Sequence, residues 1–274
     1  MSEPANSGGV RGHFIGTVVD GIAWATLNRP DALNAFSEEM RDAIIGFLLQ
    51  IEHDPQVRCV VLQGAGANFM AGGDVKLFTS QLARGAQERR ALFETLCHRM
   101  HPIIYLLRRL QKPVVASVQG ACAGLGMSLV LACDLAIAAE NAFFTLAYVK
   151  IGTTPDAGAS FFLPRTVGMK RAMEIALLSE RLDAQAAERL GLINRVVPTE
   201  RLAEETRTLA ARLAAGATQA IGRTKALISG AFSRDLEAHL QLEGINFGAC
   251  AASADMLEGV NAFVEKRRPH FRNE

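Results

Sequence analysis

The feature that most constrains the fold of this chain is a set of three short, continuous apolar runs. They lie within VRCVVLQGAG (57–66), PVVASVQGACAGLG (113–126) and DLAIAAE (134–140). Apolar residues at consecutive positions indicate strands that are buried on both faces. Because segments with helical periodicity separate these runs, we predict an α/β fold in which helices cover both faces of a parallel sheet.

Local signals before the first of these runs predict a hairpin and a helix. Two β-rich stretches flank Asp20-Gly21, a strong two-residue hairpin signal. Ser37 is typical of a helix N-cap, and Glu38 and Glu39 follow it in the first turn. The apolar residues that then recur at helical spacing are Met40, Ala43, Ile44, Phe47, Leu48 and Ile51.

The last third of the chain changes in character, because Ala, Leu, Arg and Glu dominate from about Pro198 onward. We predict helix starts there at Thr199, Ser233 and Ser253. The expected organisation is therefore a polar, disordered lead (1–12), an α/β core (13–197) and a helical region (198–274).

Composition excludes several classes of function. The net charge is +1, from 29 basic and 28 acidic residues without a basic block, which argues against a nucleic-acid partner. Apolar runs fall short of the roughly 18 residues that span a bilayer, so we expect no membrane partner. The five cysteines form no Cys-x-x-Cys pair, which indicates reduced thiols, no metal site and a cytoplasmic location.

Two glycine-rich strand ends are candidate binding positions for an anion. They are GAGANFMAGGDVK (64–76) and QGACAGLGMSLVLACD (119–134). Each leaves a buried strand and approaches a helix start, where backbone N–H groups are free to donate. Two such groups on one oxygen would form an oxyanion hole. Close packing of helix on strand is the alternative for each, and neither segment matches a phosphate loop or a dinucleotide fingerprint.

The order of five motifs resembles the crotonase, or enoyl-CoA hydratase/isomerase, superfamily over residues 14–271. The motifs are LNRPDALNAFS, NFMAGGDVK, VQGACAGLGMSLVLACDLAIA, TLAYVKIGTTPDAGASFFLPRTVG and AAERLGLINRVVP. The resemblance implies a spiral of repeated ββα units and a C-terminal helical region that builds a homotrimer or a hexamer (a dimer of trimers). It also implies an acyl-CoA thioester substrate, with coenzyme A entering as part of that substrate and no permanently bound cofactor.

The resemblance assigns the two oxyanion-hole donors to the backbone N–H groups of Gly73 and Leu125. The two glutamates with which hydratases of the family activate water would fall on Ser128 and Tyr148. Neither is a carboxylate, so a two-carboxylate hydration mechanism is not expected. Both residues are expected to line the acyl pocket, and a packing role is the alternative.

Asp156, in TTPDAG, is the remaining acid that the motifs bring to the thioester. Taken alone, Pro-Asp-x-Gly is ordinary turn chemistry. The resemblance places Asp156 where isomerases of the family carry a single acid, which would remove a proton from C2 and return it at C4. We expect apolar neighbours to raise its pKa; the candidates are Leu146, Ile151, Phe161 and Phe162.

Coenzyme A contacts are expected from the segment around residue 34. The resemblance implies that the backbone of Asn34 and Ala35 embraces the cofactor portion of the substrate. Arg29 and Lys76 are candidate phosphate contacts, since a cation beside a pyrophosphate is favourable. Solvated surface charge is the alternative for both.

Expected roles can also be given for five further residues. Phe263 and Lys266 resemble the family pair that reaches the cofactor bound to a neighbouring subunit, although Lys266 also suits the charged last turn of a helix. Asp74 is expected to be a helix cap, and His98 and His101 are expected to be surface or core residues.

The sequence therefore predicts an enzyme that shifts the double bond of an enoyl-CoA, with Asp156 as acid and base. Two alternatives stay open. One is an enoyl-CoA hydratase, or another crotonase-type enzyme, with atypical acid/base groups; the other is a non-catalytic acyl-CoA-binding homologue.

Overall fold

The strands form two sheets in the computed structural model, which describes residues 12–273; residues 1–11 of the predicted lead lie outside the described residues. The large sheet has the order β1-β2-β3-β4-β6-β9 and the small sheet the order β5-β7-β8. The large sheet contains β1 (Phe14–Val19), β2 (Ile22–Leu27), β3 (Cys59–Gly64), β4 (Val114–Val118), β6 (Leu135–Ala139) and β9 (Arg195–Val197). The small sheet contains β5 (Ala121–Ala123), β7 (Phe143–Thr145) and β8 (Leu182–Asp183). Only β1 runs antiparallel to its neighbour among the described pairs of the large sheet, which confirms the predicted parallel sheet.

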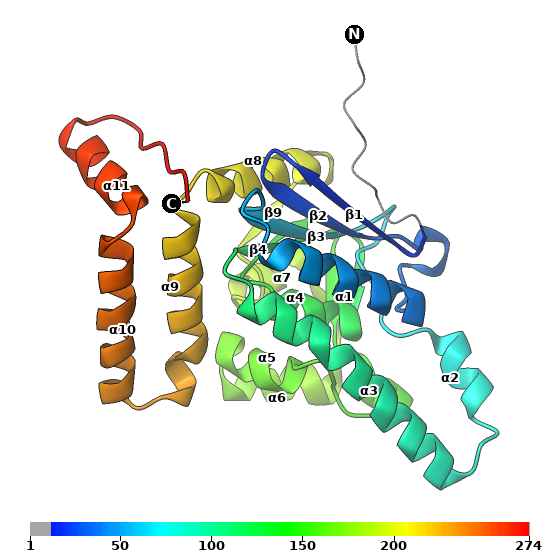
Figure 1. Cartoon of the computed structure of the whole chain (residues 1–274). Helices are drawn as coiled ribbons and strands as arrows, with labels where there is room; N and C mark the ends of the chain where they lie inside the picture. The colour runs from blue at the N-terminus through cyan, green and yellow to red at the C-terminus, as the bar shows by residue number, and fades with distance from the viewer. Residues whose placement is uncertain (1–11, 274) are drawn as a thin grey trace.

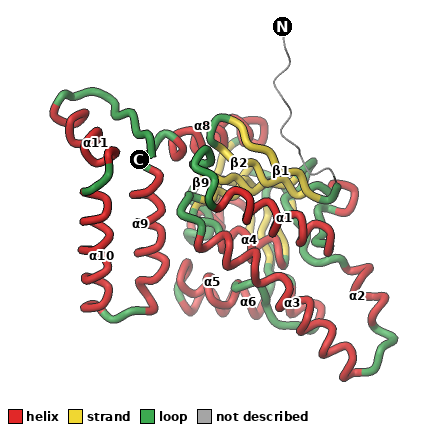
Figure 2. The backbone as a smooth tube through the Cα atoms, viewed as in Figure 1, coloured by secondary structure: helices red, strands yellow, loops and turns green. Residues whose placement is uncertain are grey.

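Helices surround the sheets, as Figure 2 shows in red. In the first half of the chain they are α1 (Glu38–Glu52), α2 (Val75–Gln81), α3 (Ala86–Arg109) and α4 (Leu125–Ala132). They continue with α5 (Ala159–Val167), α6 (Met169–Leu178), α7 (Ala184–Arg189), α8 (Leu202–Ala214), α9 (Thr218–Gly230), α10 (Leu236–Ala251) and α11 (Ala254–Val264). Short 3-10 turns are η1 (Pro30–Ala32), η2 (Tyr148–Ile151), η3 (Thr199–Arg201) and η4 (Ala231–Ser233).

Alternate residues of β3 face two separate apolar clusters, one on each face of the large sheet. Val60 and Leu62 pack in the larger cluster with residues of α1, α3 and α4. Cys59 and Val61 pack in the smaller one, against Leu202 and other residues of α8. Successive side chains of a strand point to opposite faces, so a continuous apolar run is buried only when both faces are covered. Figure 1 shows α1 and α8 on opposite sides of the sheet.

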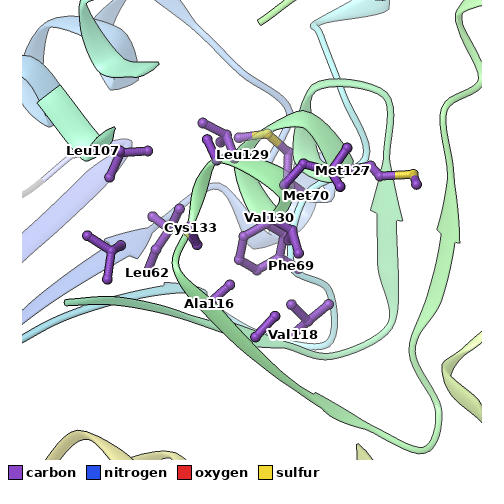
Figure 3. Close-up of a cluster of buried hydrophobic side chains, with 14 of the residues drawn as sticks. Leu62, Phe69, Met70, Leu107, Ala116, Val118, Met127, Leu129, Val130 and Cys133 are labelled. Carbon is purple, nitrogen blue, oxygen red and sulfur yellow. The ribbon is translucent and has the colours of Figure 1, made fainter. Parts of the chain in front are cut away.

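Helix α4 lies inside the larger cluster and is buried at every position. Figure 3 shows its Met127, Leu129 and Val130 close to Phe69 and Met70. A helix that is apolar all round is stable only when it is enclosed. The first turn of α4 is therefore held rigidly by its surroundings.

Two consecutive ββα units build the middle of the chain, as the predicted spiral requires. In each unit a strand of the large sheet (β4 or β6) is followed by a strand of the small sheet (β5 or β7) and then by a helix (α4 or α5). Because β5 and β7 are hydrogen-bonded neighbours, the start of α4 and the loop after β7 lie close together.

Helices α9, α10 and α11 form an arm beside the core, drawn in orange and red in Figure 1. None of the residues of α10 is buried. Lys225 of α9 attaches the arm to the core, because its Nζ donates to the carbonyl oxygens of Leu107 (2.8 Å) and Lys112 (3.1 Å). The same Nζ lies 2.7 Å from Oδ2 of Asp134.

Bilayer-spanning helices are not found among residues 12–273, since none there is long and apolar enough.

Most of the predicted element boundaries are confirmed. The hairpin pairs Val19 with Ile22, and the side chains of Ser37 and Ser253 accept from the amides three residues later. At Thr199 a 3-10 turn precedes α8. The predicted start at Ser233 is wrong: it ends a 3-10 turn, and α10 is capped by Asp235, which accepts from the amide of Ala238 at 2.8 Å. Asp and Ser are comparable caps, so the sequence alone did not separate them.

Candidate active site

The first predicted donor, the amide of Gly73, lies in the loop between β3 and α2. Gly72, which adopts φ 95°, accepts from the amide of Phe36 at 3.0 Å. Asp74 caps α2, since its side chain accepts from the amide of Lys76 at 3.0 Å, which confirms the expectation of a cap. Within residues 12–273 the Gly73 amide has no protein acceptor. It is therefore available to an anion.

The second predicted donor, the amide of Leu125, opens helix α4. Gly124 precedes it at φ 52°, ψ −119°, a conformation that only glycine adopts without strain. Its own amide donates to the carbonyl of Thr145 at 2.9 Å, which ties the helix start to β7. As the first residue of an α-helix, Leu125 has no intrahelical acceptor for its N–H.

The two donor loops touch each other. A Cβ added at Gly72 would lie 3.4 Å from the carbonyl oxygen of Ala123, and one added at Gly124 would lie 3.6 Å from the Cα of Gly72. The residues next along the chain are Gly73 and Leu125. The structure thus brings the two predicted donors to one place, where each N–H would stabilise a developing oxyanion by about 3 kcal/mol.

Asp156 lies in the loop between η2 and α5, and both of its carboxylate oxygens have partners. The hydroxyl of Tyr148 donates to Oδ1 in a short hydrogen bond. The thiol of Cys97, from α3, donates to Oδ2 across 3.8 Å. A carboxylate held at both oxygens has a defined orientation.

Ser128 and Tyr148, predicted to line the acyl pocket, contact each other. Ser128 is fully buried one turn after Leu125, and its Oγ lies 3.0 Å from the Tyr148 hydroxyl. Burial raises the pKa of Tyr148 well above its usual range, and the charge of Asp156 raises it further. The phenol therefore stays protonated and acts as a hydrogen-bond donor.

Burial also raises the pKa of Asp156, in the predicted direction. The hydrogen bonds from Tyr148 and Cys97, and the charge of a protonated His101, oppose this increase. Of the four expected apolar neighbours, Leu146 is buried, whereas Ile151 and Phe161 are 61% and 46% exposed. A buried carboxylate with a raised pKa is a stronger base than one in water.

Cys97 and His101 are the two residues near Asp156 that sequence reasoning missed. Both stand on α3, four residues apart and therefore on one face of the helix. His101 is half-buried, whereas His98 is exposed as expected. The spacing was visible in the sequence, but nothing in it indicated which helix face meets the loop of Asp156.

A groove of about 720 Å³ lies next to this loop, between the core and α9. His101 and Gly158 are among its lining residues. Apolar side chains from both sides, such as Leu131, Phe162 and Phe232, also line it. Helix α9 of the arm therefore lies across the groove from the core, next to the loop that carries Asp156.

Arg29 stabilises the segment that is predicted to bind coenzyme A. Its guanidinium donates to the carbonyl of Ala35 at 2.7 Å and forms an ion pair with Asp74 at 3.1 Å. The side chain of Asn34 is buried, where it accepts from the amide of Arg29 and donates to two carbonyls. Lys76 is exposed at the start of α2, one turn from the Gly73 donor.

Phe263 and Lys266 are not brought to Asp156 within the chain. Phe263 is 85% exposed at the end of α11, and Lys266 follows this helix. Figure 1 shows α11 on the arm, away from the start of α4.

Comparisons with known proteins agree with one another. The sequence model described as "Enoyl-CoA hydratase/isomerase" matches residues 17–274. The 1,2-epoxyphenylacetyl-CoA isomerase of Escherichia coli (strain K12) is 39% identical over 254 residues, which cover 93% of this chain and 96% of that protein. The crotonyl-CoA hydratase of Syntrophomonas wolfei is 33% identical, covering 91% and 94%. An enoyl-CoA hydratase structure from Polaromonas sp. JS666 superposes with a TM-score of 0.89 at 35% identity, covering 95% of this chain and 100% of that one.

Proposed function

This chain belongs to the enoyl-CoA hydratase/isomerase family, and we propose that it shifts the double bond of an enoyl-CoA thioester with Asp156 as its single acid and base. The observation that carries the proposal is the environment of Asp156. It is a carboxylate with a raised pKa, fixed by hydrogen bonds. The two positions that would hold hydratase glutamates carry Ser128 and Tyr148 instead. The similarity to a 1,2-epoxyphenylacetyl-CoA isomerase supports isomerase chemistry.

The reaction needs one proton to leave C2 of a 3-enoyl thioester and to return at C4. The thioester oxygen would accept from the amides of Gly73 and Leu125. Asp156 would take the C2 proton while the C–H electrons move into an enolate stabilised by those amides. The same carboxyl group would then return the proton to C4 and leave a 2-enoyl thioester. The carboxylate is regenerated, so no co-reactant is consumed.

The proposed substrate contacts follow the family pattern. The backbone of Asn34 and Ala35 would embrace the cofactor portion of the substrate. Exposed Lys76 would meet its phosphates. For Arg29, the contacts with Ala35 and Asp74 support a role in holding this segment in shape.

Turnover on three classes of substrate tests the proposal. We expect the protein to isomerise 3-enoyl-CoA, and we would assay 2-enoyl-CoA hydration and opening of a ring-epoxide CoA alongside. Asp156→Asn should lower kcat by about 10³-fold while acyl-CoA binding persists, because Asn has no basic oxygen. Asp183→Asn is a matched control, since Asp183 only caps α7 and Asn caps equally well.

Three outcomes would overturn the proposal. Wild-type rates in Asp156→Asn would remove the assigned base. Hydration of crotonyl-CoA as the fastest reaction would establish the hydratase alternative, which the similarity to a crotonyl-CoA hydratase keeps in view. Binding without turnover of any substrate would establish an acyl-CoA-binding protein.

A further inference from the structure

A chain of hydroxyl groups connects the first turns of α4 to the carboxylate of Asp156. Tyr148 donates to Oδ1 of Asp156, and the Ser128 Oγ lies 3.0 Å from the Tyr148 hydroxyl. The Ser128 Oγ is also 3.4 Å from the carbonyl oxygen of Gly124, which shares a peptide group with the Leu125 amide. The chain therefore runs from Ser128, three residues after the proposed oxyanion donor Leu125, to the carboxylate.

The direction of the chain follows from counting hydrogens. An ionised Asp156 has no proton to give, so the single hydrogen of the Tyr148 hydroxyl goes to Oδ1. The phenol oxygen then accepts from Ser128, which has one hydrogen and cannot also donate to Gly124. The order is Ser128 to Tyr148 to Asp156.

The two carboxylate oxygens of Asp156 therefore differ in basicity. Oδ1 accepts a charge-assisted O–H bond, which is among the stronger hydrogen bonds in proteins. Oδ2 faces a thiol at 3.8 Å, and S–H is a weak donor. A proton is therefore accepted more readily on Oδ2.

Resting on the isomerase function proposed above, we infer that Tyr148 is a positioning residue for the proton transfer. It holds Oδ1, prevents the carboxylate from rotating, and leaves Oδ2 to take the proton from C2 and return it to C4. Ser128 holds Tyr148 in turn.

The groups that face Asp156 come from two elements. Tyr148 comes from η2, whereas Cys97 and His101 come from α3. Among these, His101 is the side chain whose positive charge would also lower the pKa of Asp156. A pH test must therefore separate His101 from Tyr148.

The first experiment compares Tyr148→Phe with Tyr105→Phe. The sequence has two tyrosines, and the change to Phe removes the same hydroxyl group from each. Tyr105 is 66% exposed. We expect Tyr148→Phe to lower kcat about 10- to 100-fold with little change in KM. Since the lost hydrogen bond favours the ionised carboxylate, the acid limb of the kcat/KM profile should move to higher pH. Ser128→Ala should shift it less, and Tyr105→Phe should leave kcat and the profile unchanged.

His101→Gln provides the control for histidine. The shift caused by Tyr148→Phe should persist when His101→Gln is also present. A shift that disappears in this double variant, or a Tyr148→Phe profile equal to that of the wild type, would overturn the inference while isomerase activity remained.

A second readout is independent of turnover. Protein labelled with [¹³Cζ]tyrosine should give two resonances, which the two Phe variants assign. The Tyr148 resonance should titrate with Asp156 and should lose this titration in Asp156→Asn, whereas the Tyr105 resonance should do neither. A Tyr148 resonance that ignores Asp156→Asn would refute the contact. Absence of isomerase activity with the titration intact would instead refute the proposed function.

Discussion

Asp156 is a residue whose ionisation opposes folding. Burial raises its pKa above the usual value of 3.8, so the folded chain binds this proton more tightly than the unfolded chain does. The group therefore contributes its full stability below pH 3.8, and that contribution is lost as the pH rises through the folded pKa. At neutral pH the buried charge is a cost that the proposed catalytic role would require.

We predict that Asp156→Asn raises the free energy of unfolding at pH 7. The neutral amide escapes the desolvation cost, and its oxygen still accepts from Tyr148. The difference from the wild type should shrink as the pH approaches 3.8. Urea unfolding at a fixed protein concentration measures both quantities, and Asp183→Asn should show no such pH-dependent gain. A variant less stable than the wild type at pH 7 would contradict the prediction.

Sequence reasoning singled out candidate residues for the site, but it did not predict their contacts with one another. Asp156 was singled out by its motif, and Ser128 and Tyr148 by the hydratase positions they occupy. The hydrogen bonds among these residues depend on the position of η2 relative to α4. No local sequence pattern predicts this position. Cys97 lies 59 residues from Asp156 along the chain, and only tertiary packing brings it there.

At the scale of elements, the start of α4 depends on Gly124. We predict that Gly124→Ala lowers kcat at least about 10²-fold, comparable to losing an oxyanion donor. Its dihedral angles, φ 52° and ψ −119°, strain any residue with a Cβ by about 1–3 kcal/mol, so the Leu125 amide would turn away. Steady-state kinetics on a 3-enoyl-CoA provides the measurement.

Gly191→Ala is the matched control for this change. Gly191 also has a positive φ, 76°, and a Cβ there would meet nothing closer than 4.0 Å. The kcat of the Gly191→Ala variant should stay near that of the wild type. Equal losses in the two variants would indicate general destabilisation rather than a displaced donor.

The attachment of α9 gives a second prediction about elements. Lys225→Met should lower the free energy of unfolding by about 1–3 kcal/mol, because the change leaves partly buried Asp134 and two carbonyls without their ammonium partner. Urea denaturation measures this loss. The exposed Lys170→Met should change stability by less than about 0.5 kcal/mol, and a similar result for Lys225→Met would show that the contact is not needed.

The elements themselves were largely predictable because their signals are local. Consecutive apolar residues indicated buried strands, and Ser37 and Ser253 marked helix starts. The start of α10 was placed at Ser233 because two capping residues stand close together there. The ion pair of buried Lys225 with partly buried Asp134 had no sequence signal, since it joins residues 91 positions apart.

For the whole molecule, the arm presents apolar surface to solvent. On α10, Leu240 and Phe247 are 54% and 72% exposed, and their spacing of seven places them on one face. On α11, Phe263 and Val264 are 85% and 74% exposed. Exposed apolar side chains gathered on one helix face usually belong to an interface. This supports the predicted assembly through residues 198–274.

We predict that the protein is a homotrimer or a hexamer and that Leu240→Asp with Phe247→Asp dissociates it. Two charges on the apolar face would have to be buried without partners in the interface. Light scattering after gel filtration, at several protein concentrations, measures the mass. Leu49→Asp, at a 49% exposed site on α1, should leave the mass unchanged. A wild-type monomer at micromolar concentration would refute the assembly.

The remoteness of α11 from Asp156 has a genetic consequence. If Phe263 and Lys266 of one subunit complete the site of the next, two inactive alleles should complement each other. The Asp156→Asn variant lacks the proposed base but keeps Phe263 and Lys266. The variant with Phe263→Ala and Lys266→Glu keeps the base but lacks these two side chains. Unfolding and refolding the two variants together should restore a fraction of wild-type turnover that neither shows alone. Each subunit would then act as both enzyme and accessory to its neighbour.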